Sequence, residues 1–185
     1  MKGAEIGVME LPDPQPTSGQ ILVAPQFAGI CGSDLHVRAA MKQMAEQTPE
    51  TQRASLPGLV PGHEFSAEVV EIGPGADTPF KRGDRIVPIP FVKSGHGTEI
   101  VGLSAAYSGG LSNLSVVIAD RCFRIPQSIP FDLAALTEPL SVGRHAANLA
   151  NRNRGPNLII GCGPVGLAVL LALKAQGRGP ILAAD

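Results

Sequence analysis

The stretch that decides the fold is Leu158-Ile159-Ile160-Gly161-Cys162-Gly163-Pro164-Val165-Gly166, close to the C-terminus. Its apolar start predicts a buried strand, its glycines predict a tight turn, and the apolar run that follows predicts a helix as far as Gln176. A second strand is predicted over residues 181–185. A strand, a GxGxxG turn, a helix and a further strand are the order typical of the first β-α-β unit of a Rossmann domain.

The turn and the start of the helix supply the candidate cofactor-binding residues. Glycines at the first and second positions permit the turn and the approach of a pyrophosphate, and the third allows close packing of helix on strand. Asp185 lies 19 positions after the last glycine, where an acid would accept hydrogen bonds from the adenosine ribose and favour NAD over NADP. The alternative is an ordinary glycine-rich connection. The candidates in the turn are Gly161, Gly163, Pro164, Val165 and Gly166.

Two earlier segments carry residues suited to metal and proton chemistry. They are Gly29-Ile30-Cys31-Gly32-Ser33-Asp34-Leu35-His36 and Gly62-His63-Glu64. A catalytic zinc takes three protein ligands from cysteine, histidine and carboxylate, and keeps one position open. Cys31 and His63 are 32 positions apart, so no local spacing rule joins them. A buried structural cysteine and a packed histidine are the simpler interpretations.

Composition excludes several classes of function. Fifteen basic and sixteen acidic residues leave no charge bias towards nucleic acid or an anionic membrane surface. The N-terminus has no apolar signal segment, and residues 165–173 form too short an apolar run to span a bilayer. Three cysteines without a CxxC pair argue against disulfides and for a reducing compartment, so we expect a cytoplasmic protein.

The distribution of glycine, proline and apolar residues predicts two domains. Short strands punctuated by Gly and Pro indicate a small barrel or sandwich, and residues 91–110 are predicted as loop. Residues 34–50 hold good helix formers, and residues 132–150 are predicted to form one helix. The polar segment 151–157 predicts the domain boundary. The predicted strands of the first domain are Gln20–Val23, Phe65–Ile72, Arg85–Pro88 and Ser115–Ile118.

Five motifs in order along the chain resemble the zinc-dependent medium-chain dehydrogenases. The resemblance covers almost the whole chain and implies a mixed β and α/β fold. Residues 1–150 would form a GroES-like β-barrel catalytic domain, and residues 151–185 the start of a Rossmann NAD-binding domain. The motifs are Gly29–His36, Gly62-His63-Glu64, Gly83-Asp84-Arg85-Ile86-Val87, Thr137-Glu138-Pro139-Leu140 and Gly161–Gly166.

The resemblance also implies a ligand set for the metal. Cys31 and His63 would bind a catalytic zinc, and Glu138 resembles the third ligand of the polyol and threonine dehydrogenase branch. Ligands of this kind would also accept cobalt or iron. Residues 88–110 contain no cysteine, so we expect no structural zinc, and the shortened lobe leaves a homo-oligomer as an open question.

Four polar residues near these ligands receive supporting roles from the resemblance. Ser33 would hydrogen-bond the substrate hydroxyl, and His36 would continue the proton relay to water. Asp34 and Glu64 would orient the ligands and tune the charge of the site. The simpler alternatives are a turn residue at Ser33, a solvated helix position at His36, and ordinary polar residues at the other two.

The expected reaction is hydride transfer between an alcohol or polyol and NAD, with a small alcohol or carbonyl compound as substrate. Because the sequence stops after one β-α-β unit, we expect an N-terminal fragment with little dehydrogenase activity of its own. Two alternatives stay open. One is a zinc-free quinone or enoyl reductase of the same superfamily, and the other is a non-catalytic domain that binds zinc or a partner.

Overall fold

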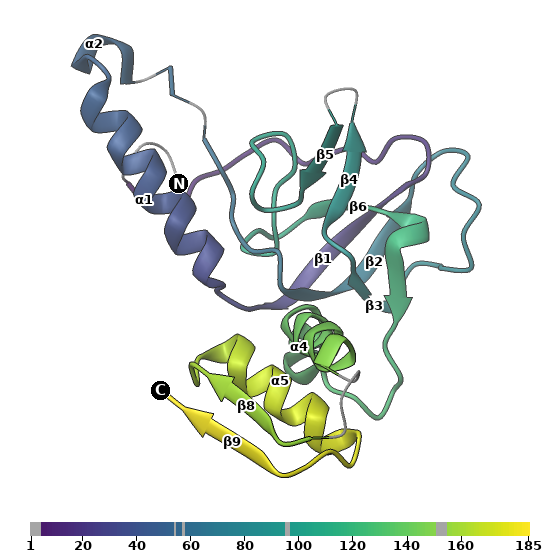
Figure 1. The fold of residues 1–185 in the computed structure, drawn as a ribbon. Coiled ribbons are helices and arrows are strands. Elements are labelled where there is room, and N and C mark those ends of the chain that lie inside the picture. The colour runs from purple at the N-terminus through teal and green to yellow at the C-terminus, as the bar shows by residue number, and fades with distance from the viewer. Residues whose placement is uncertain (1–4, 54, 57, 95–96, 151–154) are drawn as a thin grey trace. The chain divides into compact units, whose positions relative to one another are not determined.

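The computed structural model describes residues 5–53, 55–56, 58–94, 97–150 and 155–185, and the chain divides into two compact units, Met1–Ala135 and Leu136–Asp185 (Figure 1). The division lies between Ala135 and Leu136, whereas the sequence predicted a boundary at residue 151. Residues 151–154 of that predicted boundary lie outside the described residues. The elements of the first unit are β1 Gln20–Ala28, α1 Gly32–Gln47, α2 Glu50–Arg53, β2 Phe65–Ile72, β3 Arg85–Pro88, β4 Phe91–Ser94, β5 Gly97–Ile100, β6 Ser115–Ile118, β7 Cys122–Arg124 and α3 Phe131–Ala135.

A five-stranded antiparallel sheet forms the centre of the first unit. Its order is β6-β1-β2-β3-β7, and alternate residues of β1 and β2 supply the core, including Ile21, Val23, Phe65, Ala67 and Val69. All four predicted strands are present, and the mixed β and α/β class is confirmed. The predicted barrel is not closed: among the described residues, β6 and β7 form the two edges of the sheet.

A β-hairpin replaces part of the loop predicted over residues 91–110. Strands β4 and β5 pair with each other, from Phe91 opposite Ile100 to Ser94 opposite Gly97. They form a separate two-stranded sheet and do not extend the five-stranded one. Val92 and Val101 are nevertheless part of the same hydrophobic core as β1 and β2, so the hairpin packs against the sheet.

Helix α1 begins directly after Cys31, whose backbone is extended with φ −85° and ψ 157°. The Asp34 side chain accepts the Cys31 backbone N–H at 2.8 Å, a bond that fixes the first turn. The helix ends where the Thr48 hydroxyl donates to the Met44 carbonyl at 2.7 Å and Pro49 follows. Among the described residues, no helix is long and apolar enough to cross a membrane.

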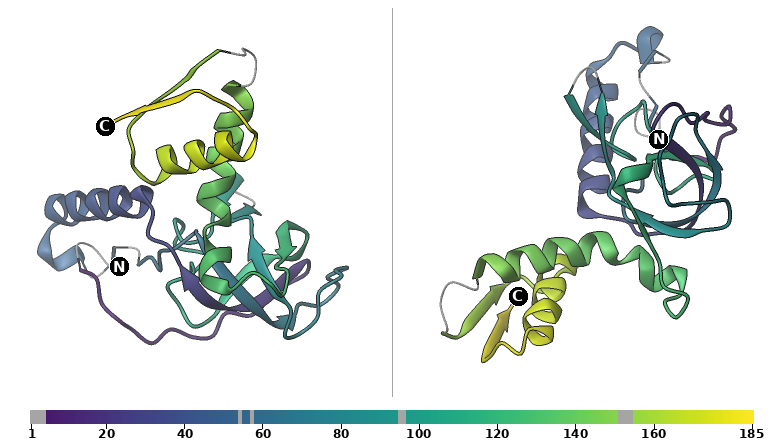
Figure 2. Two further views of the ribbon diagram at one scale, coloured as in Figure 1. Left: turned by 90° about the horizontal axis from the view of Figure 1, so that it is seen from below. Right: turned by 90° about the vertical axis from the view of Figure 1, so that its right-hand side faces the viewer.

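The second unit is a helix followed by one β-α-β unit, as Figures 1 and 2 show. Strands β8 and β9 are parallel, and α5 connects them. Helices α4 and α5 approach closely at Gly143, where an added Cβ would overlap Ala168. Ala147, Ile159 and Leu173 form the buried core. The elements are α4 Thr137–Leu149, β8 Asn157–Ile160, α5 Pro164–Ala175 and β9 Ile181–Ala184.

The single helix predicted over residues 132–150 is wrong, because the structure has α3 and α4 separated at Leu136. The cause is Pro139. Its ring lacks the N–H that a continuous helix would direct at the Ala135 carbonyl, and proline is tolerated only within the first turn of a helix. The chain therefore ends one helix at Ala135 and starts the next at Thr137, which places Pro139 in a first turn.

Candidate metal centre

Pairing of β1 with β2 brings the two chemically suited segments together. The register ends with Ala28 opposite Phe65, and the next backbone N–H, of Gly29, donates to the Glu64 carbonyl at 2.7 Å. Residues that follow β1 therefore lie beside residues that precede β2. This topology places Cys31 next to His63 in spite of their separation in sequence.

Three potential metal ligands converge at this point. The sulfur of Cys31, a ring nitrogen of His63 and a carboxylate oxygen of Glu64 all lie within 4.8 Å of one another. His63 and Glu64 are buried and Cys31 is half-buried. A thiolate, an imidazole and a carboxylate are the ligand types of catalytic zinc sites, so the residues fit a zinc ion. The sequence predicted the first two as ligands and gave Glu64 only a supporting role.

The His63 ring is held between two side chains of the first turn of α1. Its Nε2 lies 3.2 Å from the Ser33 hydroxyl, and its Nδ1 lies 3.5 Å from Oδ1 of Asp34. Nδ1 is buried and has no hydrogen-bond partner among the residues that the structure describes. A carboxylate facing one nitrogen of a histidine is the arrangement that orients the other nitrogen towards a metal. The orphaned Nδ1 therefore fits a site that tightens when a metal binds.

Asp34 links the backbones of the two segments. Asp34 is buried, with 5% of the residue exposed. Oδ2 accepts the Cys31 N–H at 2.8 Å, and Oδ1 accepts the Gly62 N–H at 3.4 Å. One buried carboxylate thus contacts the main chain on both sides of the cluster and faces His63, and its orienting role stays a prediction.

Two glycines leave room for this arrangement. A Cβ on Gly29 would come within 2.5 Å of the Glu64 carboxylate oxygen Oε2. Gly62 has φ +98°, a conformation that favours glycine, and a Cβ there would meet Leu111. Both glycines belong to the motifs Gly29–His36 and Gly62-His63-Glu64, and no function was predicted for them. Their role is steric and depends on contacts that sequence spacing does not reveal.

The two residues of the predicted proton relay occupy one face of α1. Ser33 is half-buried beside His63, and His36 is exposed one helical turn further along. Residues three apart in a helix are neighbours on its surface. Ser33 therefore lies at the cluster, and His36 is exposed on the neighbouring surface of the helix.

The predicted nucleotide-binding turn connects β8 and α5. Gly161 has φ +95°, and a Cβ on Gly166 would overlap the Gly161 carbonyl, so both positions need glycine. Gly163 precedes the helix, and Pro164 is its first residue, followed by Val165. Asp185 follows β9, and its Oδ1 accepts the Cys162 backbone N–H at 2.8 Å. The acid at the end of β9 therefore already contacts the turn.

Glu138, the third ligand implied by the resemblance, lies in the first turn of α4 in the second compact unit. Its backbone carbonyl accepts the Ser141 hydroxyl at 2.7 Å. The cluster of Cys31, His63 and Glu64 belongs entirely to the first unit.

Two other titratable groups of the first unit have shifted pKa values. A hydrogen bond from Arg124 lowers the pKa of Asp84, which also accepts the Lys81 backbone N–H at 2.8 Å. Burial raises the pKa of Cys122 to about 12, and the nearby Asp120 adds to the shift. The Asp84 carboxyl group is thus stabilised as the anion, and the Cys122 thiol is stabilised in its neutral form.

Comparison with known proteins finds relatives among the alcohol and polyol dehydrogenases along almost the whole chain. Residues 17–127 match the family described as alcohol dehydrogenase GroES-like domain. The (R,R)-butanediol dehydrogenase of Bacillus subtilis is 32% identical, over 98% of this chain and 55% of the relative. A sorbitol dehydrogenase of Bacillus subtilis is also 32% identical, over 98% of this chain and 53% of the relative.

Solved structures with a similar fold are also dehydrogenases or oxidoreductases. The crystal structure of 2R,3R-butanediol dehydrogenase from Bacillus subtilis has a TM-score of 0.75 at 28% identity, covering 100% of this chain and 56% of that one. An Escherichia coli oxidoreductase of unknown specificity has a TM-score of 0.81 at 27% identity, covering 99% and 55%. The chain spans about half the length of the relatives that it matches. It belongs to the medium-chain alcohol and polyol dehydrogenases, the family with the alcohol dehydrogenase GroES-like domain.

Proposed function

We propose that this chain carries the zinc site of an oxidoreductase that transfers hydride between an alcohol or polyol and NAD. The observation that carries the proposal is the convergence of Cys31, His63 and Glu64 within 4.8 Å of one another. The names of the relatives, which are butanediol and sorbitol dehydrogenases, support an alcohol or carbonyl compound as substrate.

Cys31, His63 and a glutamate would hold one zinc ion and leave one position open. We assign the glutamate as Glu64, because its carboxylate lies in the cluster, and keep Glu138 as the assignment that the family resemblance implies. When bound, zinc supplies a Lewis acid that polarises the alcohol oxygen and favours its deprotonation.

Side chains at the start of α1 would handle the proton. The Ser33 hydroxyl lies at the cluster and would accept the proton of the substrate alcohol while passing its own outward. His36 is exposed one turn away and would deliver that proton to solvent. Asp34, which faces Nδ1 of His63, would keep the ring in the orientation that ligation needs.

The second unit would bind the dinucleotide. Backbone N–H groups at the start of α5, from Gly163 through Val165, would cradle the pyrophosphate, and the helix dipole favours that negative charge. Asp185 would exchange its bond to the Cys162 N–H for the ribose hydroxyls, which favours NAD over NADP.

Zinc and nucleotide affinity, measured separately on the purified chain, test the proposal. Chelator competition is expected to give one tight zinc per chain, and calorimetry is expected to detect NAD binding that is weaker for NADP. Zinc binding without any nucleotide binding would favour a non-catalytic zinc domain. Nucleotide binding without zinc would favour a zinc-free reductase.

Matched glutamine variants test the third ligand. Glu64→Gln is expected to weaken zinc by more than about 100-fold, beyond the 10- to 100-fold typical of residues that only support a ligand. Glu68→Gln is the control, because Glu68 is exposed on β2, the strand that directly follows Glu64. A comparable loss in Glu138→Gln with none in Glu64→Gln would transfer the assignment to Glu138.

A further inference from the structure

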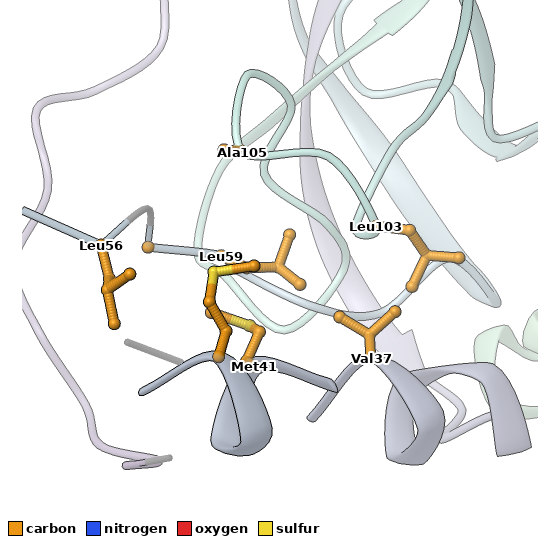
Figure 3. A pocket seen from close by; sticks show the side chains of 8 residues that line it. Val37, Met41, Leu56, Leu59, Leu103 and Ala105 are labelled. Carbon is orange, nitrogen blue, oxygen red and sulfur yellow. The ribbon is translucent and has the colours of Figure 1, made fainter. Parts of the chain in front are cut away.

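An apolar pocket of about 160 Å³ lies in the first unit, beside α1. Figure 3 shows Val37 and Met41 of the helix directed towards Leu59 and Leu103, with Leu56 and Ala105 at the margins. Met44 and Gly58 complete the lining. All these side chains are apolar, so the described part of the lining offers no hydrogen bond from a side chain to a hydroxylated ligand.

The pocket-lining side chains of α1 follow Ser33, which contacts His63 of the candidate metal centre, along the same helix. Ser33, Val37, Met41 and Met44 follow one another at intervals of four, four and three residues, so they share a face of the helix. With a rise of about 1.5 Å per residue, Val37 lies about 6 Å and Met41 about 12 Å along the axis from Ser33. On the opposite side of the pocket, the buried Leu59 precedes His63 in the chain by four residues. The helix side of the pocket therefore begins four residues after Ser33, and the opposite side begins four residues before His63.

We propose that this pocket binds the apolar substituent of the substrate alcohol, a ring or alkyl group of about six carbons. An apolar cavity of about 150 Å³ accommodates benzene, which sets the size of the group. Placing a polyol there would strip water from hydroxyls without replacing their hydrogen bonds, and that costs free energy. The inference rests on the proposed function and narrows its substrate class to alcohols with an apolar tail.

Methionine methyl signals in nuclear magnetic resonance report directly on the pocket. The chain has four methionines, two of which, Met41 and Met44, line it, while Met9 is 57% exposed elsewhere. Hexanol is expected to shift the Met41 and Met44 signals saturably, and affinity is expected to fall about fourfold for each methylene removed down to butanol. Sorbitol is expected to leave the same signals unmoved at equal concentration.

Two variants make the test specific. Met41→Gln keeps the length of the side chain but adds an amide, and is expected to weaken hexanol binding by about tenfold or more. Met9→Gln is the matched control and is expected to change nothing. Equal responses to hexanol and sorbitol, or hexanol binding unaltered by Met41→Gln, would overturn the inference.

Zinc content measured on the same samples separates the two proposals. A chain that holds zinc but shows no hexanol response would refute the pocket assignment and leave the proposed function standing. A saturable hexanol response in a chain that binds neither zinc nor NAD would refute the proposed function, and with it the assignment of the pocket to a substrate, although the pocket would still bind apolar groups.

Discussion

Replacing Asp34 with asparagine should weaken zinc binding and the fold together. The carboxylate accepts N–H groups of Cys31 at 2.8 Å and Gly62 at 3.4 Å, one on each oxygen. An amide has a single acceptor oxygen, so one buried donor loses its partner at a cost of about 1–3 kcal/mol in the free energy of unfolding. Nδ1 of His63 also loses the charge that faces it at 3.5 Å, and zinc affinity should fall about 10- to 100-fold.

The assay combines urea denaturation of the zinc-free chain with chelator competition for zinc. Asp84→Asn is the matched control, because Asp84 is also buried and also accepts a backbone N–H, from Lys81, but lies outside the cluster. Asp84→Asn should lower stability and leave zinc affinity unchanged. Unchanged zinc affinity in a folded Asp34→Asn chain would refute the orienting role of Asp34.

Three further predictions concern the first unit. Gly29→Ala should weaken zinc binding in chelator competition, since the added Cβ would displace the Glu64 carboxylate, and equal affinity would contradict this. Arg124 lowers the pKa of Asp84, so their ion pair contributes its full stability above the unfolded pKa of about 3.9 and loses that stability as the pH falls through the folded pKa. The midpoint of urea denaturation should therefore drop on acidification, and it should drop less steeply in Arg124→Gln. Cys122, with its pKa raised to about 12, should alkylate slowest of the three cysteines at neutral pH by mass spectrometry, and fast labelling would argue against its burial.

Strand positions in the first unit could be predicted because burial follows sequence alternation there. Phe65–Ile72 alternates apolar and polar residues, and β2 has these bounds. The hairpin of β4 and β5 could not be predicted in the same way. Glycine-rich sequence around the hairpin resembles loop, and the pairing depends on the core that Val92 and Val101 join from outside the sheet.

Between residues 132 and 150, a single residue determines where the predicted helix is interrupted. Alanine and leucine predict helix throughout residues 132–150, and that composition was right for most of them. The break at Leu136 follows from one missing hydrogen-bond donor, at Pro139. The break places Glu138 in the first turn of a new helix rather than in the middle of a long one.

Only part of the candidate site could be predicted from the sequence. Residue types at Cys31 and His63 pointed to zinc, but their proximity depends on the pairing of β1 with β2. Glu64 adjoins His63 in sequence. The direction of its side chain depends on the register between β1 and β2, which sequence spacing does not reveal. The apolar pocket does have a signal in the sequence, which is the spacing of Val37, Met41 and Met44 on one helix face.

The most direct measurement is the metal content of the purified chain, determined by elemental analysis beside a Cys31→Ser variant. The account predicts about one zinc per chain in the unchanged protein and a loss of that zinc in the variant, with circular dichroism verifying that both are folded. A folded chain that contains no zinc, and takes up none when zinc is supplied, would contradict the assignment of Cys31, His63 and Glu64 as a metal site.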